Sequence, residues 1–130
     1  MKQIVVDTNA FLRLFLDDVP QQVKEVEVLL KKARSAQITA YVPQIVIFEL
    51  NFILDKYYNF KKVEIIDKLK SVIQSPYLHV QDRTILQEAL KIYEKNTVSL
   101  ADSFVLSFAQ EKGAEVFTFD KNLQKLITQN

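Results

Sequence analysis

Two aspartates follow short runs of apolar and β-branched residues, at the points where strands are expected to end. Asp7 follows the run at residues 3–6, and Asp120 follows the run at residues 115–119. An aspartate between a strand and a helix is often an N-cap, because its side chain accepts hydrogen bonds from the first helical N–H groups. For either aspartate alone, that structural explanation is sufficient.

A third carboxylate, Asp102, lies three residues after Ser99 at the start of a predicted helix. This spacing resembles a capping box, in which a hydroxyl and an acid three positions later satisfy free backbone N–H groups. Ser99 is therefore assigned a capping role only, and Asp102 also has an ordinary structural explanation when it is taken alone.

The fourth carboxylate, Glu49, lies in a strongly apolar helix predicted at residues 44–57. The polar stripe of this helix consists of Gln44, Asn51 and Asp55. Glu49 points about 140–160° away from that stripe. The face around it consists of Ile45, Val46, Phe52 and Ile53. A carboxylate on an apolar face is costly unless it pairs with a cation or binds a metal, and Lys56 is the alternative partner.

The elements that position these acids alternate along the chain. Strands are expected at residues 3–6, 38–42, 77–80 and 115–119. Helices are expected at residues 8–16, 21–34, 44–57, 61–73, 83–94, 99–111 and 121–127, the sixth of them closed by Gly113. Strands separated by helices predict a parallel sheet covered on both faces, with ligands bound beyond the carboxyl ends of its strands.

Considered together, the acids predict a metal site. If the first strand lies between the second and the fourth, Asp7, Glu49, Asp102 and Asp120 converge on one cleft. Such a cluster is self-repelling, and a divalent cation resolves the repulsion, because Mg²⁺ and Mn²⁺ prefer carboxylate oxygens. A metal held in this way activates water and shields a phosphodiester during in-line attack. The predicted reaction is metal-assisted phosphodiester hydrolysis.

Composition narrows the alternatives. The chain has 130 residues, no cysteine and one histidine, His79, so thiol chemistry is excluded and a zinc site is improbable. The formal net charge of +1 gives no global sign of a nucleic-acid partner. The opening apolar run is too short for a signal peptide, and no segment is long enough to span a membrane. A single cytoplasmic domain over residues 1–130 is expected.

The motifs also resemble those of the PIN-domain nucleases, and especially of the VapC-type toxins of toxin–antitoxin pairs. They are Val6-Asp7-Thr8-Asn9, Glu49 after a Val-Pro step, Ala101-Asp102-Ser103-Phe104, and Val116-Phe117-Thr118-Phe119-Asp120-Lys121. Their order and spacing agree over nearly the whole chain, and no extra domain is left over.

The resemblance implies an α/β fold, a three-layer α-β-α sandwich around a short parallel sheet of order 3-2-1-4, sometimes with a fifth strand. It implies an endoribonuclease that binds Mg²⁺ or Mn²⁺ through Asp7, Glu49, Asp102 and Asp120. Thr8, Asn9 and Thr118 would orient carboxylates or water. A homodimer and a cognate antitoxin that occupies the cleft are the implied protein partners, and RNA is the implied substrate.

Other residues have weaker functional interpretations. Contacts with RNA phosphates are assigned to Arg13, Lys56 and Lys121, and Lys125 is a further candidate, although a solvated lysine is commoner. His79 is interpreted as a hydrogen-bonded strand residue. The pairs Phe48/Phe52 and Phe104/Phe108 are expected in the core, because side chains four residues apart meet on a helix. Tyr57, Tyr58 and Phe60 either pack in the core or line a protein-binding surface.

Two alternatives remain open at this point. In an aspartate-nucleophile phosphatase, Asp7 would be phosphorylated, but a second acid would be expected where Asn9 stands. In a catalytically silent domain of the same fold, the cleft would bind RNA or protein without cutting. No glycine-rich nucleotide loop is present, which argues against a nucleoside triphosphate substrate.

Overall fold

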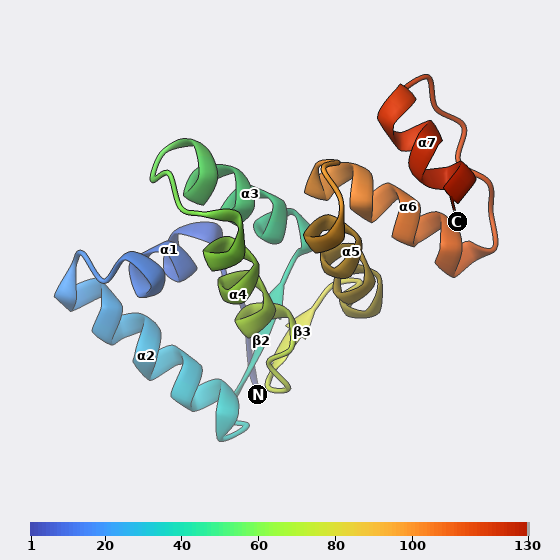
Figure 1. Cartoon of the computed structure of the whole chain (residues 1–130). Coiled ribbons are helices and arrows are strands. Elements are labelled where there is room, and N and C mark those ends of the chain that lie inside the picture. The colour runs from blue at the N-terminus through green and yellow to red at the C-terminus, as the bar shows by residue number, and fades with distance from the viewer. Residues whose placement is uncertain (130) are drawn as a thin grey trace. The chain divides into compact units, whose positions relative to one another are not determined.

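The computed structural model describes residues 1–129, and its elements are labelled in Figure 1. The strands are β1 (Lys2–Val5), β2 (Ile38–Val42) and β3 (Leu78–Val80). The helices are α1 (Thr8–Leu16), α2 (Pro20–Arg34), α3 (Gln44–Lys56), α4 (Lys62–Ile73), α5 (Arg83–Lys95), α6 (Leu100–Lys112) and α7 (Lys121–Gln129). The chain divides into two compact units, Met1–Gln81 and the residues from Asp82 onward.

The first unit is built on a three-stranded parallel sheet of order β1-β2-β3. Lys2 of β1 is in register with Ile38, and Ala40 of β2 is in register with Leu78. The central strand is the best buried, since Ala40 and Val42 have no exposed surface. The α/β class, the parallel sheet and the helices that connect its strands agree with the predicted fold.

The fourth predicted strand does not form in the structure. Residues 115–119 have no regular secondary structure, and the side chains of Phe117 and Phe119 are 89% and 85% exposed. An extended segment becomes a strand only when a neighbour accepts and donates its backbone hydrogen bonds. Within residues 82–129 there is no other strand to supply them. The alternation of residue types was therefore insufficient to predict a strand.

Apolar helix faces close the core of the first unit. α3 packs against α4, and α1 packs against both α2 and α3. The side chains of Phe11, Leu50, Leu54 and Leu69 are at most 1% exposed. Burying a side chain of this size contributes about 1.5–3 kcal/mol, so these positions account for much of the stability of the unit. The side chain of Glu64 caps the start of α4, because its Oε1 accepts from the Lys61 N–H at 2.9 Å.

The second unit is held together by packing of helix against helix. α5 packs along α6, and the Ser107 hydroxyl donates to the Ile85 carbonyl oxygen at 2.8 Å. A separate cluster consists of Val98, Leu106, Leu123 and Leu126, with Ile92, Val116 and Ile127 at its edge. This cluster anchors α7 to the loop before α6. The predicted cap at Gly113 is confirmed, with φ of 63° at the end of α6.

The expected burial of the phenylalanine pairs was partly wrong. Phe52 is 54% exposed and Phe108 is 43% exposed. α3 turns Val46, Ile47, Leu50 and Leu54 inward, which leaves Phe52 on the outer side. The rings of Phe104 and Phe108 do meet, with centroids 6.2 Å apart, but on a partly exposed face.

No helix within residues 1–129 combines the length and the apolar character that crossing a membrane requires.

Candidate functional site

Asp7 occupies the cap position of α1 without using its side chain as a cap. Its backbone is extended, with φ −84° and ψ 165°, and its carbonyl oxygen accepts from the Ala10 N–H at 3.1 Å. Its carboxylate makes no cap hydrogen bond. The residue is exposed directly beyond the end of β1. The helix-cap explanation therefore does not account for the carboxylate, which is left available to a ligand.

The position of Glu49 in the sequence suggested that its side chain points into the core. In the structure it does not. The residue is exposed, and so are Ile45 at 58% and Phe52 at 54% on the same side of α3. The helix is apolar on both sides, and Val46, Ile47 and Leu50 form the side that is buried. The Glu49 carboxylate is therefore not buried, and burial does not require it to have an ion-pair partner or a metal. Its orientation is set by a different contact.

The contact that fixes Glu49 is a hydrogen bond from Thr8. The Thr8 hydroxyl donates to Glu49 Oε1 at 2.6 Å, across 41 positions of the chain. That distance lies in the range of charge-assisted O–H···O⁻ bonds. Thr8 is itself only 5% exposed, so its hydroxyl is held rigidly. The bond ties the carboxylate on α3 to the residue that follows Asp7.

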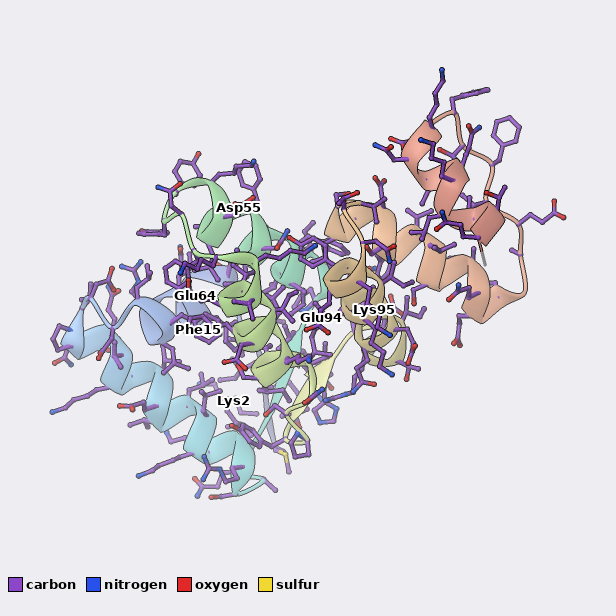
Figure 2. All side chains as sticks on the ribbon, in the orientation of Figure 1. Lys2, Phe15, Asp55, Glu64, Glu94 and Lys95 are labelled. Carbon is purple, nitrogen blue, oxygen red and sulfur yellow. The ribbon has the colours of Figure 1, made fainter. Side chains whose placement is uncertain are left out.

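Lys56, the alternative partner for Glu49, is engaged elsewhere. The Lys56 Nζ lies 3.6 Å from Oδ2 of Asp55, which is labelled in Figure 2. Both side chains are largely exposed, so this pair contributes at most about 1 kcal/mol. The ion-pair explanation for Glu49 is replaced by the bond from Thr8.

A cavity of about 370 Å³ lies beside Asp7. Its lining consists of Ile4, Val5, Val6, Asp7, Asn9, Ala10, Arg13, Gln22, Glu25, Val26 and Leu29. Arg13 pairs through Nη1 with Asp18 Oδ2 at 3.3 Å. Its Nε is buried and has no partner within residues 1–129. Because this partly exposed ion pair is weak and Nε has no partner, little free energy is lost when the Arg13 guanidinium turns toward a ligand in the cavity.

In the second unit, Asp102 lies in the first turn of α6 and is half-buried. Its backbone N–H donates to the Ser99 hydroxyl at 3.0 Å, so Ser99 caps the helix as predicted. The reciprocal bond of a capping box, from the Ser99 N–H to the Asp102 carboxylate, is not made. The carboxylate itself therefore has no structural task among residues 82–129.

Asp120 does act as a helix cap. Its Oδ1 accepts from the Leu123 N–H at 2.9 Å, which fixes the start of α7. Its own N–H donates to the Thr118 hydroxyl at 3.0 Å. Thr118 thus holds the backbone of Asp120 and not its carboxylate. One carboxylate oxygen is occupied by the cap, and the other is left for a further ligand. Lys121 follows as an exposed residue at the start of the helix.

His79 has a structural partner. It is exposed on β3, and its ring centroid lies 5.4 Å from that of Tyr41 on the neighbouring strand. Its place on β3 agrees with the prediction, but among residues 1–129 its ring makes this cross-strand contact and not the expected hydrogen bond.

The structure therefore groups the predicted residues in two sets. Asp7, Thr8 and Glu49 belong together in the first unit, and Asp120 with Thr118 belongs to the second, as does Asp102 with Ser99. Within residues 1–129, no group of three or more acidic or histidine side chains is placed to hold a metal ion. The available donors are carboxylate, hydroxyl and amide oxygens, which suit Mg²⁺ or Mn²⁺ and not zinc.

Comparison with known sequences identifies the family. The sequence model of the PIN domain matches residues 4–127, nearly the whole length. The chain belongs to the PIN domain family. Among curated proteins, it is similar to a VapC ribonuclease of Aquifex aeolicus (strain VF5), at 24% identity over 123 residues. The match covers 94% of this chain and 90% of the relative. The resemblance inferred from the motifs is confirmed.

Proposed function

We propose that this PIN domain is a metal-dependent endoribonuclease, the toxin of a toxin–antitoxin pair, that hydrolyses RNA phosphodiester bonds in the cytoplasm. The observation that carries the proposal is the hydrogen bond from Thr8 to Glu49, together with the carboxylate of Asp7, which makes no cap hydrogen bond to α1. A buried hydroxyl that orients a carboxylate is the kind of contact that supports a cation ligand, and Thr8 directly follows Asp7 in the chain. The similarity to a VapC ribonuclease supports RNA as the substrate.

The proposed cation ligands are Asp7, Glu49, Asp102 and Asp120, in a single domain. Bound Mg²⁺ or Mn²⁺ would supply a nucleophile from water and neutralise charge on the phosphodiester. Thr8 restrains the rotation of Glu49, and Thr118 restrains the backbone of Asp120. Asn9, which is exposed in the cavity wall, is positioned to hydrogen-bond water or RNA beside Asp7.

Basic residues are proposed to hold the RNA backbone. Lys121 is exposed one residue after Asp120, and Lys56 is exposed at the end of α3. Arg13 lines the cavity beside Asp7, and its ion pair with the half-exposed Asp18 is weak enough to yield to a phosphate. Each of these contacts is independent of base sequence, so they would raise affinity without setting specificity.

An exposed apolar surface supports a protein partner. Ile45, Phe52 and Tyr57 are 58%, 54% and 71% exposed, and the Phe52 and Tyr57 rings meet edge to face at 6.1 Å. Clustered apolar side chains in contact with water mark protein-binding surfaces. We assign this surface to a second copy of the chain or to an antitoxin.

The deciding experiment is cleavage of a labelled RNA pool by wild type and by Asp7→Asn, with Mg²⁺, with Mn²⁺ or with EDTA. The substitution keeps the size of the side chain and removes one metal-binding oxygen, so cleavage should fall by at least about 100-fold. The matched control is Asp67→Asn, an exposed acid on α4, which should cut like wild type.

Cleavage by Asp7→Asn at the rate of the control would refute the assignment of the site. Failure of the folded wild type to cut any RNA with either metal would favour the silent binding domain. Trapping of phosphate on Asp7 would instead support the phosphatase alternative.

A further inference from the structure

A small polar recess lies in the second unit, apart from the acids already described. It measures about 160 Å³, and five of its seven lining residues are polar. They are Asn96, Thr97, Asn122, Lys125 and Gln129, with Val98 and Leu126 as the apolar part. The recess joins the loop before α6 to one side of α7.

The spacing along α7 explains why these side chains share a side. Asn122, Lys125 and Gln129 are separated by three and then four positions, which places them in one stripe of a helix. The neighbouring stripe contains Leu123 and Leu126, which are 3% and 7% exposed in the apolar cluster with Val98 and Leu106. Because this packing fixes the rotation of α7, the polar stripe faces the loop without further ordering.

The loop side of the recess is also held in place. Asn96 Nδ2 donates to the Ile92 carbonyl oxygen at 2.9 Å, which fixes the end of α5. Ser99 caps α6 two residues beyond Thr97. The loop that borders the recess is therefore anchored at Asn96 and at Ser99.

The charge of the recess points to an anion. Lys125 is its one charged residue, and none of the seven lining residues carries a carboxylate. No ion pair forms with Lys125 among residues 1–129. An ammonium group surrounded by amides and a hydroxyl offers donors to several oxygens at once, as a phosphate group requires. Lys125 is itself exposed, so its ammonium group is accessible to a ligand.

We propose that this recess binds a phosphate group of the RNA substrate, on the strand next to the bond that is cut. The inference rests on the proposed nuclease function and names where the flanking backbone lies. Asp120 caps α7, and Lys125 follows five positions later in the helix. At 1.5 Å per residue, the two are about 7.5 Å apart along the axis. Five positions also turn the helix by about 140°, so this axial distance is the least separation of the two. Stacked nucleotides rise about 3.4 Å each, so the recess holds a phosphate at least about two steps from Asp120.

The test measures binding and not cleavage. A labelled 12-nucleotide single-stranded RNA is titrated with the full chain carrying Asp7→Asn, in EDTA, over a range of salt concentrations. For single strands, each neutralised phosphate contributes about 0.7 to the slope of log affinity against log salt. Adding Lys125→Gln should lower the slope by about 0.7, and Lys125→Arg should keep it. The matched control is Lys112→Gln, an exposed lysine at the far end of α6, which should leave the slope unchanged.

A second measurement uses inorganic phosphate as the probe. In amide NMR spectra of the wild type, phosphate should shift the signals of residues 96–98, 122, 125 and 129, and Lys125→Gln should abolish those shifts. An unchanged salt slope in Lys125→Gln, or a loss equal to that of Lys112→Gln, would overturn the proposal. If wild type cuts RNA but the slope does not change, the recess is wrong and the nuclease assignment stands. If the slope falls but no RNA is cut, the recess is supported and the nuclease assignment fails.

Discussion

The hydrogen bond between Thr8 and Glu49 gives the sharpest test of how this PIN domain positions a carboxylate. Thr8→Val replaces the hydroxyl by a methyl group of similar size, so the packing of the 5% exposed side chain is preserved. The substitution removes the 2.6 Å bond and frees Glu49 to rotate. Thr8→Ser keeps the hydroxyl and is the matched control.

The expected loss of stability is small. A hydrogen bond to a charged group contributes about 1.5–3 kcal/mol, but water replaces the lost donor at an exposed carboxylate, so about 1 kcal/mol is expected. For a chain of this length, 1 kcal/mol corresponds to a fall in Tm of about 4 °C. The metal requirement should change more, because loss of a group that orients a ligand weakens metal binding about 10–100-fold.

The assay combines urea unfolding with RNA cleavage over a range of Mg²⁺ concentrations. Thr8→Val should need about 10–100 times more Mg²⁺ for half-maximal cleavage, and Thr8→Ser should behave like wild type. A double-mutant cycle with Glu49→Gln isolates the pair and should give a coupling energy of at least about 0.5 kcal/mol. Additive free energies of unfolding in the cycle, with an unchanged Mg²⁺ midpoint, would refute the role assigned to Thr8.

Two further substitutions test the second unit and the core. Asp120→Asn keeps a good N-cap for α7 and should abolish cleavage with little change in unfolding, whereas Asp120→Ala should also cost about 1 kcal/mol in urea unfolding. Equal stability of the Asn and Ala variants would contradict the capping role. Leu50→Ala empties a fully buried position on α3 and should cost about 2–5 kcal/mol in urea unfolding. A loss below about 1 kcal/mol would mean that α3 is not packed as described.

Local patterns were enough to predict the helices and the first three strands. Each depends on periodic apolar residues and on nearby caps, such as Gly113 after α6. The side of α3 that is buried could not be predicted, because that helix carries apolar residues all round and periodicity cannot choose between its faces. The failure at residues 115–119 has another cause, since a strand depends on a neighbour that its own sequence does not specify.

The candidate site shows the same division between local and distant information. The four acids could be selected from their positions at element ends and from the family motifs. The partner of Glu49 could not, because Thr8 lies 41 positions away and only the tertiary fold brings the two together. Lys125 was a candidate for phosphate contact from the sequence, but the recess around it was not predicted, although the spacing of Asn122, Lys125 and Gln129 on the last helix was a usable signal.

The bare rings of Phe117 and Phe119 have a consequence for how the protein behaves at high concentration. They lie in a run of β-formers without proline, and each is more than four-fifths exposed. Such short segments nucleate aggregation when they meet copies of themselves. Glu115 precedes the rings, and Asp120 and Lys121 follow them. Charged residues that flank an apolar segment oppose stacking of one copy on another, so neutral substitutions at these three positions are expected to make the protein more prone to aggregate.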